Sequence, residues 1–394
     1  MKSTLIYISK INNIDTVLLK IICLAVVLAI ILAGLWPFNF FPENKVKWLQ
    51  NNNGVSFSGQ GLILSHGCLQ KANESLFSDR AISVELWVKP LNEPGNLPSI
   101  FNLYDGKLPG VITVGQWRSH LIVRCRTNDP ALFKRSEPYR ERGLNNALLK
   151  NRDVFITIVS DKKESAVYIN GMQAKSYSGF SMLSEYDDEP LCIIIGNSPT
   201  GNSFWKGEFM GLAIYNKTLA PEQISANYQS WVEGDYALMK QNTGLVCLYP
   251  FDEKKESTIH NYAESGYPLI IPEIFKPVQK VFLEPVRSQD VWKISYIKDV
   301  AINLIGFIPF GIFVSALLIK TKKYRFKIIF FTVVIAGFSL SMSIELTQAY
   351  LPTRFSQLSD LVLNTFGTAI GVFIFNLIYR LADKNSIRVA KQKY

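Results

Sequence analysis

The sequence predicts a protein of mixed fold class: a four-helix transmembrane bundle with an all-β sandwich inserted between the first and second spans. Three observations lead to this prediction. Four mostly apolar stretches of about 20 residues match the thickness of the hydrocarbon core of a bilayer. They are residues 21–41, 299–319, 328–349 and 361–379. Basic residues gather at both ends and in one short loop, and residues 45–235 alternate short β-type segments with turns.

The first apolar stretch, residues 21–41, has two readings. Because lysines precede it in residues 1–20, it can begin as a cleaved signal peptide does. It is longer than a typical signal segment, however, and it ends in Trp36-Pro37-Phe38 without a small-x-small cleavage pattern. We therefore expect an uncleaved first transmembrane helix over 21–41, preceded by a cytoplasmic N-terminus over 1–20.

The basic residues indicate how the chain is oriented in the membrane. The formal net charge is +10, and the excess lies in residues 1–20, in the loop 320–327 and in a tail over 380–394. A nucleic-acid surface is the alternative reading, but short basic clusters beside apolar spans fit the positive-inside rule. We expect a multi-pass protein of the cytoplasmic membrane with both termini cytoplasmic, residues 42–298 external, and no nucleic-acid partner.

The last three spans, residues 299–379, carry polar side chains at one end of each span. In chain order they are Asp299, Asn303, Glu345, Gln348, Arg354, Asp360 and Asn364. Because consecutive spans run in opposite directions, all seven converge on the outer side of the bilayer. Ionisable residues inside a membrane are costly and mark functional sites by default. The sequence therefore predicts an outer-face polar cluster.

Helical spacing supports this cluster and leaves its role open. Asp299 and Asn303 share one face at i and i+4, and a stripe of residues at spacing three or four runs from Asp360 through Gly367 to Gly371. In one reading the cluster only holds the bundle together, with Arg354 paired to an acid. In the other it is a pocket for a polar headgroup, in which Arg354 binds phosphate or carboxylate and an acid moves a proton. The set contains no histidine or nucleophile, so the catalytic residues are unknown.

Within residues 45–235, several segments alternate as strands do. Residues 82–88 place isoleucine, valine and leucine at every second position. Residues 154–159 and 166–169 form a second strand pair, which Asn170-Gly171 ends with a strong turn signal. These patterns predict a sandwich of many short antiparallel strands.

The order of these segments resembles the laminin-G-like, concanavalin-A-like jelly roll. The matching segments are ISVELWVKP at 82–90, VYING at 167–171, IGN at 195–197, FWKG at 204–207 and AIYNKTLAPEQI at 213–224. The resemblance covers the external sandwich over 45–235. Residues 236–298 then add further strands or form a stalk.

The jelly-roll resemblance implies a binding module for glycans or proteins, and in some members a bound calcium ion. Tyr104 and Trp205 are candidates to stack on a sugar, although aromatic residues in strands more often pack in the core. Asp105-Gly106 and Asn197 stand near positions that hold calcium in such domains, although they are also ordinary turn formers. No other cofactor is expected.

Cysteines and histidines give no metal site. The three histidines have no zinc-ligand spacing with any partner in the sequence. Cys68, Cys125, Cys192 and Cys247 lie in the external domain, where disulfides can form. Four thiols allow three pairings, and the sequence does not choose among them. Buried free thiols are an equal alternative to disulfides.

The polar cluster carries a second resemblance, to the VanZ-like membrane family. The matching pattern is Asp299-x3-Asn303-x3-Phe307-x-Pro309-x-Gly311, then Glu345-x2-Gln348, then Arg354-x-Ser356-x3-Asp360-x3-Asn364-x2-Gly367. The first span and its Pro37-Phe38 are similar to that family's first helix. Where the family has a short external loop, this chain carries the jelly roll. The resemblance implies a role in low-level glycopeptide-antibiotic resistance or in envelope and exopolysaccharide processes.

Three hypotheses about function follow. The leading one is a bacterial cell-envelope membrane protein, in contact with membrane lipids, whose external domain binds an envelope glycan or surface protein near the polar pocket. The alternative is a membrane enzyme that acts on a lipid-linked or cell-wall glycan through the outer-face acids. A sensor is disfavoured because the cytoplasmic tail, 380–394, is too short for a signalling domain.

Overall fold

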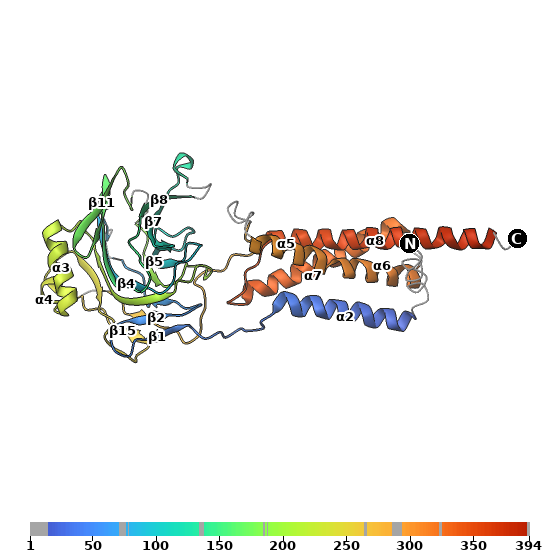
Figure 1. Ribbon diagram of the computed structural model, residues 1–394, viewed down its shortest axis with the longest axis horizontal. Coiled ribbons are helices and arrows are strands. Elements are labelled where there is room, and N and C mark those ends of the chain that lie inside the picture. Colours follow the sequence, from blue (N-terminus) through green and yellow to red (C-terminus); the bar gives the residue numbers. More distant parts are fainter. Residues whose placement is uncertain are drawn as a thin grey trace. The chain divides into compact units, whose positions relative to one another are not determined.

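The computed structural model describes residues 15–70, 76–77, 79–133, 138–183, 186, 188–263, 266–285, 294–322 and 325–391 (Figure 1). The chain divides into two compact units. One comprises Met1–Phe40 and Lys280–Tyr394, and we call it the bundle. The other is Phe41–Gln279, and we call it the β-unit.

In the part that the structure describes, the β-unit is a sandwich of two antiparallel sheets of eight strands each. The first sheet contains β1 (Val46–Trp48), β2 (Val55–Phe57), β13 (Gly207–Tyr215), β4 (Ile82–Pro90), β9 (Val154–Ser160), β10 (Glu164–Ile169) and β11 (Met172–Ser178), with β14 (Leu245–Tyr249) paired to β13. The second contains β15 (Thr258–Ile259), β16 (Leu269–Ile270), β3 (Ile63–Ser65), β12 (Cys192–Ile195), β5 (Ser99–Tyr104), β6 (Ile112–Trp117), β7 (His120–Arg126) and β8 (Tyr139–Leu144). A short 3₁₀ helix spans Pro130–Leu132.

Alternation along β4 separates the core of the sandwich from a second apolar layer. Ile82 and Leu86 lie in the core between the sheets. The opposite face is covered by helix α3 (Pro221–Glu233), where Trp87 packs against Trp231 at a ring-centroid distance of 6.4 Å. A short helix, α4 (Ala237–Lys240), follows α3. The predicted fold class is confirmed for this unit.

Residues 236–298 were expected to add strands or to form a stalk. In the structure β14 extends the first sheet by pairing with β13. In the second sheet β16 pairs with β3, and β15 pairs with β16 at the edge. The sandwich therefore does not end at 235, because strands up to Leu269–Ile270 complete both sheets.

A single buried carboxylate joins β4 to α3. Glu85 is fully buried, and it accepts hydrogen bonds from Asn227 Nδ2 at 2.8 Å and from Trp231 Nε1 at 3.1 Å. Burial raises the pKa of Glu85 to about 7, although these hydrogen bonds act in the opposite direction. The native β-unit therefore holds a proton on Glu85 at pH values where the unfolded chain has lost it.

This carboxylate is expected to make the β-unit less stable as pH rises. The raised pKa stabilises the folded state fully below the unfolded value near 4.5, and this contribution is lost as pH rises to about 7. The shift corresponds to ~3 kcal/mol in the free energy of unfolding. Urea unfolding of residues 41–279 between pH 4.5 and 8 measures it. Glu85→Gln should flatten the dependence, and an unchanged slope would contradict the assignment.

A disulfide joins neighbouring strands of the second sheet. Cys68 follows β3 and is bonded to Cys192 at the start of β12, next to the bridge between Leu69 and Leu191. Cys125 and Cys247 are buried as thiols. Within the described residues these four cysteines thus form one disulfide and two buried thiols rather than any of the three complete pairings.

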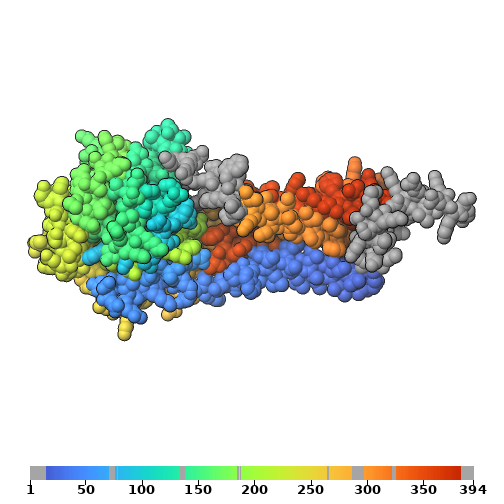
Figure 2. Space-filling model, viewed as in Figure 1, coloured from blue at the N-terminus to red at the C-terminus, as the bar shows by residue number. Residues whose placement is uncertain are grey.

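Among its described residues the bundle contains four helical stretches long and apolar enough to cross a membrane. Its helices are α2 (Thr16–Leu35), α5 (Ile294–Gly306), α6 (Ile308–Lys322), α7 (Phe326–Tyr350) and α8 (Leu358–Lys391), of which α5 and α6 share the second stretch, Ile297–Thr321. In Figure 2, α2 lies in blue along one side of the bundle.

The first span ends earlier than predicted. Helix α2 stops at Leu35, whereas the sequence prediction extended the span to 41. Pro37 has no amide hydrogen to donate, and it disfavours a helical conformation for Trp36. The helix also begins earlier, at Thr16 rather than at 21.

Glycines allow α5 and α6 to approach α8 closely, as the small-residue stripe predicted. A Cβ atom placed on Gly367 would lie 2.2 Å from the Leu304 carbonyl oxygen, and one on Gly371 would lie 2.2 Å from the Ile308 carbonyl oxygen. These approaches bring the backbones of the two helix pairs into direct contact.

Candidate functional site

A cavity of about 610 Å³ lies within the bundle. It is bounded by α2, α5, the start of α6, α7, α8 and the turn over 351–357, which we call the α7–α8 turn. All seven residues of the predicted polar cluster line it: Asp299 and Asn303 from α5, Glu345 and Gln348 from α7, Arg354 from the turn, and Asp360 and Asn364 from α8. Apolar side chains of α2 and α5 complete the wall.

Several polar atoms in this cavity are buried without a hydrogen-bond partner. Within the described residues these include Gln348 Oε1, Thr353 Oγ1, Arg354 Nε and Asn364 Oδ1. The side chains of Gln348 and Asn364 are only 3% and 4% exposed. A buried polar atom left unpaired is costly, so a polar group inside the cavity is needed to satisfy them.

Arg354 is positioned by the end of α2. Its Nη2 donates to the carbonyl oxygen of Gly34 at 3.1 Å, and Gln348 Nε2 donates to the same oxygen at 2.7 Å. Carbonyls in the last turn of a helix lack intrahelical partners, and such oxygens favour a nearby cation. Across the described residues no ion pair joins Arg354 to Glu345 or Asp360. The described residues therefore lack the ion pair between Arg354 and an acid that is expected if the cluster only holds the bundle together.

The carboxylates are held by neutral donors. Glu345 Oε2 accepts the Gln357 amide hydrogen at 2.8 Å. Asp360 accepts a hydrogen bond from Ser359 Oγ at 3.2 Å and another from the Asn303 side chain. These contacts orient the carboxylates, and none of the donors is a charged side chain.

A segment after the β-unit holds the α7–α8 turn in place. Lys280 Nζ donates to the carbonyl oxygens of Pro352 at 3.1 Å and Arg354 at 2.5 Å, and it lies 4.9 Å from the centre of the Phe355 ring. Burial lowers the pKa of Lys280 to about 8. Ser356 Oγ accepts the Leu283 amide hydrogen at 3.1 Å. The sequence prediction missed Lys280, because its partners are backbone oxygens that no residue pattern reveals.

The two aromatic residues proposed to stack on a sugar are not accessible, which corrects the prediction. Trp205 has no exposed surface, and its Nε1 donates to Gln116 Oε1 at 2.7 Å. Tyr104 is 4% exposed, and its hydroxyl donates to Gln279 Oε1. Both side chains pack in the β-unit, and their polar atoms form hydrogen bonds within that unit. Neither is therefore exposed to stack on a sugar.

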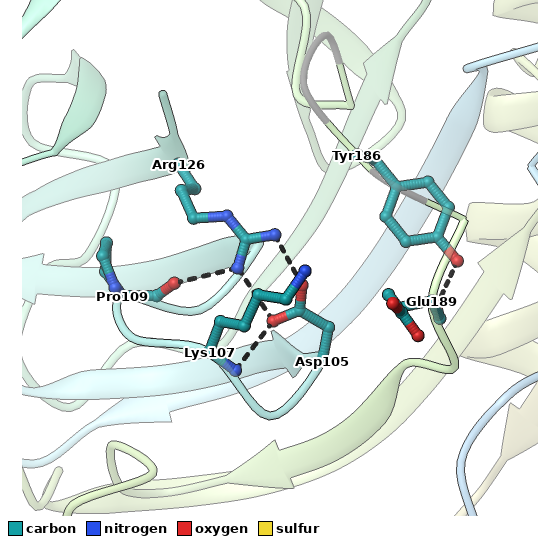
Figure 3. Close-up of polar contacts among 6 residues, drawn as sticks. All are labelled: Asp105, Lys107, Pro109, Arg126, Tyr186 and Glu189. Atoms are coloured by element: carbon teal, nitrogen blue, oxygen red, sulfur yellow. Dashed lines mark hydrogen bonds and ion pairs between the residues drawn. The ribbon is translucent and has the colours of Figure 1, made fainter. Parts of the chain in front are cut away.

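The residues considered for calcium are also engaged. Figure 3 shows Arg126 reaching the Asp105 carboxylate, with Nη1 at 2.8 Å from Oδ1 and Nη2 at 2.5 Å from Oδ2. Asn197 Oδ1 accepts the amide hydrogens of Ser198 at 2.9 Å and Ser203 at 3.1 Å. In this structure the Asp105 carboxylate is therefore held by Arg126, and the Asn197 side-chain oxygen is held by backbone amides.

The two units together define a multi-pass membrane protein with a lectin-like β-sandwich. Comparison with family models identifies the parts: residues 243–379 match the VanZ/LLP1 family, and residues 66–225 match the concanavalin A-like lectin/glucanases superfamily. The chain thus contains a VanZ-like domain and a laminin-G-type domain, and both resemblances seen in the sequence are confirmed. The first span lies outside the VanZ/LLP1 match.

Two solved structures resemble this chain distantly. The receptor binding domain of botulinum neurotoxin C/D mosaic serotype is 16% identical with a TM-score of 0.37, over 48% of this chain and 45% of that one. A native heptameric SAP-like pentraxin from Limulus polyphemus is 13% identical with a TM-score of 0.37, over 59% of this chain and 95% of that one. This chain thus spans less than half of the neurotoxin domain. Comparison with curated proteins found no match.

Proposed function

We propose that this chain is a bacterial cell-envelope protein of the cytoplasmic membrane, whose bundle binds a polar headgroup and whose β-unit binds an envelope glycan or surface protein. The observation that carries the proposal is the cavity, which all seven cluster residues line. Four of the side chains that line this cavity have a buried polar atom without a hydrogen-bond partner. A site built only for stability would pair these atoms internally.

Two independent features support an orientation with the β-unit outside and both termini in the cytoplasm. Basic residues flank the ends of the spans that this orientation places inside, for example at Lys320 and Lys327. The disulfide between Cys68 and Cys192 belongs to an oxidising compartment. In this orientation the cavity lies near the outer leaflet.

The mixed lining of the cavity favours an amphiphile. Val26 and Ile30 of α2 face the cavity together with Ile302 of α5, and the polar cluster lines the remainder. A water-soluble sugar has no use for such an apolar wall, whereas a lipid places its chain there and its headgroup among the polar residues.

Glycan or protein binding by the β-unit is supported by its match to the lectin superfamily. We place the process in the handling of envelope glycans, either in low-level glycopeptide resistance or in exopolysaccharide formation, because the VanZ resemblance implies those settings. The binding surface is not assigned to Tyr104 or Trp205, since both are buried.

Substitutions in the cavity test the proposal. Glu345→Gln, Arg354→Ala and Asp360→Asn are each expected to reduce glycopeptide tolerance and exopolysaccharide output to the level of a strain without the gene, at normal protein abundance. Each removes a charge that faces the cavity. The matched control is Ser343→Ala on α7, because Ser343 is exposed and its hydroxyl donates to the Ser339 carbonyl of the same helix.

The same purified full-length proteins, applied to an array of bacterial glycans, test the second half of the proposal. Binding by the β-unit should persist in all three cavity variants, since none of them lies in that unit. Loss of folded protein in all three would instead support a purely structural cluster. An array without any bound glycan would restrict the β-unit to protein ligands.

A further inference from the structure

We propose that the headgroup bound in the cavity is a zwitterion that carries a primary ammonium next to a single phosphate, as phosphoethanolamine does. This inference rests on the proposed function, that the cavity binds a headgroup, and it names the chemical class.

The charged groups of the cavity favour a cation. Three carboxylates line it, from Asp299, Glu345 and Asp360, against one guanidinium, from Arg354. Among the described residues none of these acids is in an ion pair. Like charges repel strongly where the effective dielectric constant is low, so a positive group between the acids stabilises all three.

The unpartnered acceptors give a second and independent indication. Gln348 Oε1 and Asn364 Oδ1 are buried, line the cavity and lack a donor. Their own amide nitrogens are already used, on the Gly34 carbonyl and on Ser341 Oγ respectively. An ammonium group offers three donors and no acceptor, which matches a cavity that combines two unpartnered amide oxygens with carboxylates.

Arg354 supplies the site for the anionic part of the headgroup. Its Nη2 is occupied by Gly34, whereas its Nε is buried without a partner. A phosphate oxygen forms a strong, charge-assisted hydrogen bond with such a nitrogen. The single positive charge of Arg354 matches the charge of a phosphate monoester or diester better than that of a diphosphate, which carries more negative charge than one arginine neutralises.

The opening of the cavity indicates that the headgroup arrives on a lipid. Ala29 and Ala33 of α2 are exposed and line the cavity, and so do Ile302 and Gly306 of α5. The cavity therefore opens between α2 and α5, on a side of the bundle that a bilayer covers with lipid. A lipid headgroup can enter there while its chains run along the apolar wall of the cavity and out among the exposed apolar residues of α2 and α5.

Native mass spectrometry of the purified full-length protein in a nonionic detergent tests this inference. The probes are dioctanoyl phosphatidylethanolamine, its N-acetylated form and dioctanoyl phosphatidylglycerol, which share chains and phosphate but differ in the ammonium. We expect the ethanolamine lipid to bind about tenfold or more tightly than either of the others, as loss of one buried charge contact predicts. Excess O-phosphoethanolamine as competitor distinguishes a soluble source from a lipid source.

Variants assign the binding to the cavity. Asp299→Asn and Asp360→Asn should lower the affinity for the ethanolamine lipid to that of the N-acetylated form, whereas Asp153→Asn, an exposed acid of the β-unit, should not. If all three lipids bind equally and the cavity variants weaken all of them, headgroup binding stands and the ammonium inference is overturned. If no lipid responds to any cavity variant, the proposed function fails as well. The comparison of the three lipids on the unmodified protein decides the inference even where a variant does not fold.

Discussion

Replacing Gly371 by valine is expected to prevent the bundle from folding. Any Cβ at this position would meet the Ile308 carbonyl oxygen at 2.2 Å and the Gly311 Cα at 2.9 Å. Both contacts are with backbone atoms, so no side chain can rotate away, and α6 and α8 must separate. Overpacking of this kind costs ~3 kcal/mol or more. In a membrane the loss is severe, because close backbone contact is itself a main source of helix association.

The control for this experiment is Gly306→Ala, a substitution at another glycine of the bundle. A Cβ on Gly306 meets no atom within 4 Å, although Gly306 lies in the same span as Ile308. Thermal stability in detergent, followed by size-exclusion chromatography, should show a normal profile for Gly306→Ala and aggregated or absent protein for Gly371→Val. A Gly371→Val protein with the melting temperature of the parent would show that α6 and α8 are not packed this closely.

The bundle and its polar cluster were predictable because both depend on local rules. Spans of fixed length follow from the thickness of the bilayer, and helical periodicity places residues such as Asp360, Asn364 and Gly367 on one face. Alternating direction then brings the ends of three spans together without any knowledge of tertiary contacts. Pro37 and Pro309 also indicate where helices end or break. The predicted first span nevertheless extended to 41, beyond the end of α2 at Leu35.

What the sequence could not show depends on backbone atoms and on long-range packing. The partner of Arg354 is the carbonyl oxygen of Gly34, and the partners of Lys280 are two carbonyl oxygens of the α7–α8 turn. Any residue type carries such an oxygen, so no residue pattern predicts these contacts. Trp205 was misassigned because its role is set by Gln116, which is far from it in sequence.

Removal of the Cys68–Cys192 disulfide is expected to have the second large effect, on the β-unit. The bond closes a loop with a sequence separation of 124 residues. In the chain-entropy account a loop of this length stabilises by up to ~5 kcal/mol, and measured values are typically about 2–4 kcal/mol. The double variant Cys68→Ser/Cys192→Ser should therefore unfold at markedly lower urea concentration than the oxidised protein. Reduction with dithiothreitol should bring the parent to the same midpoint.

The same cysteines also decide the orientation of the chain in the cell. If the β-unit is external, Cys68 and Cys192 are oxidised there and should resist maleimide labelling of denatured whole-cell protein until a reductant is added. Cys247→Ala is the control. The buried thiol of Cys247 is not part of the disulfide, so labelling should still increase when dithiothreitol is added to this variant. Labelling of both cysteines without reductant would place the β-unit in a reducing compartment. The cavity would then face the cytoplasm, because the α7–α8 turn and the segment that leaves the β-unit at Lys280 lie at the same end of the bundle.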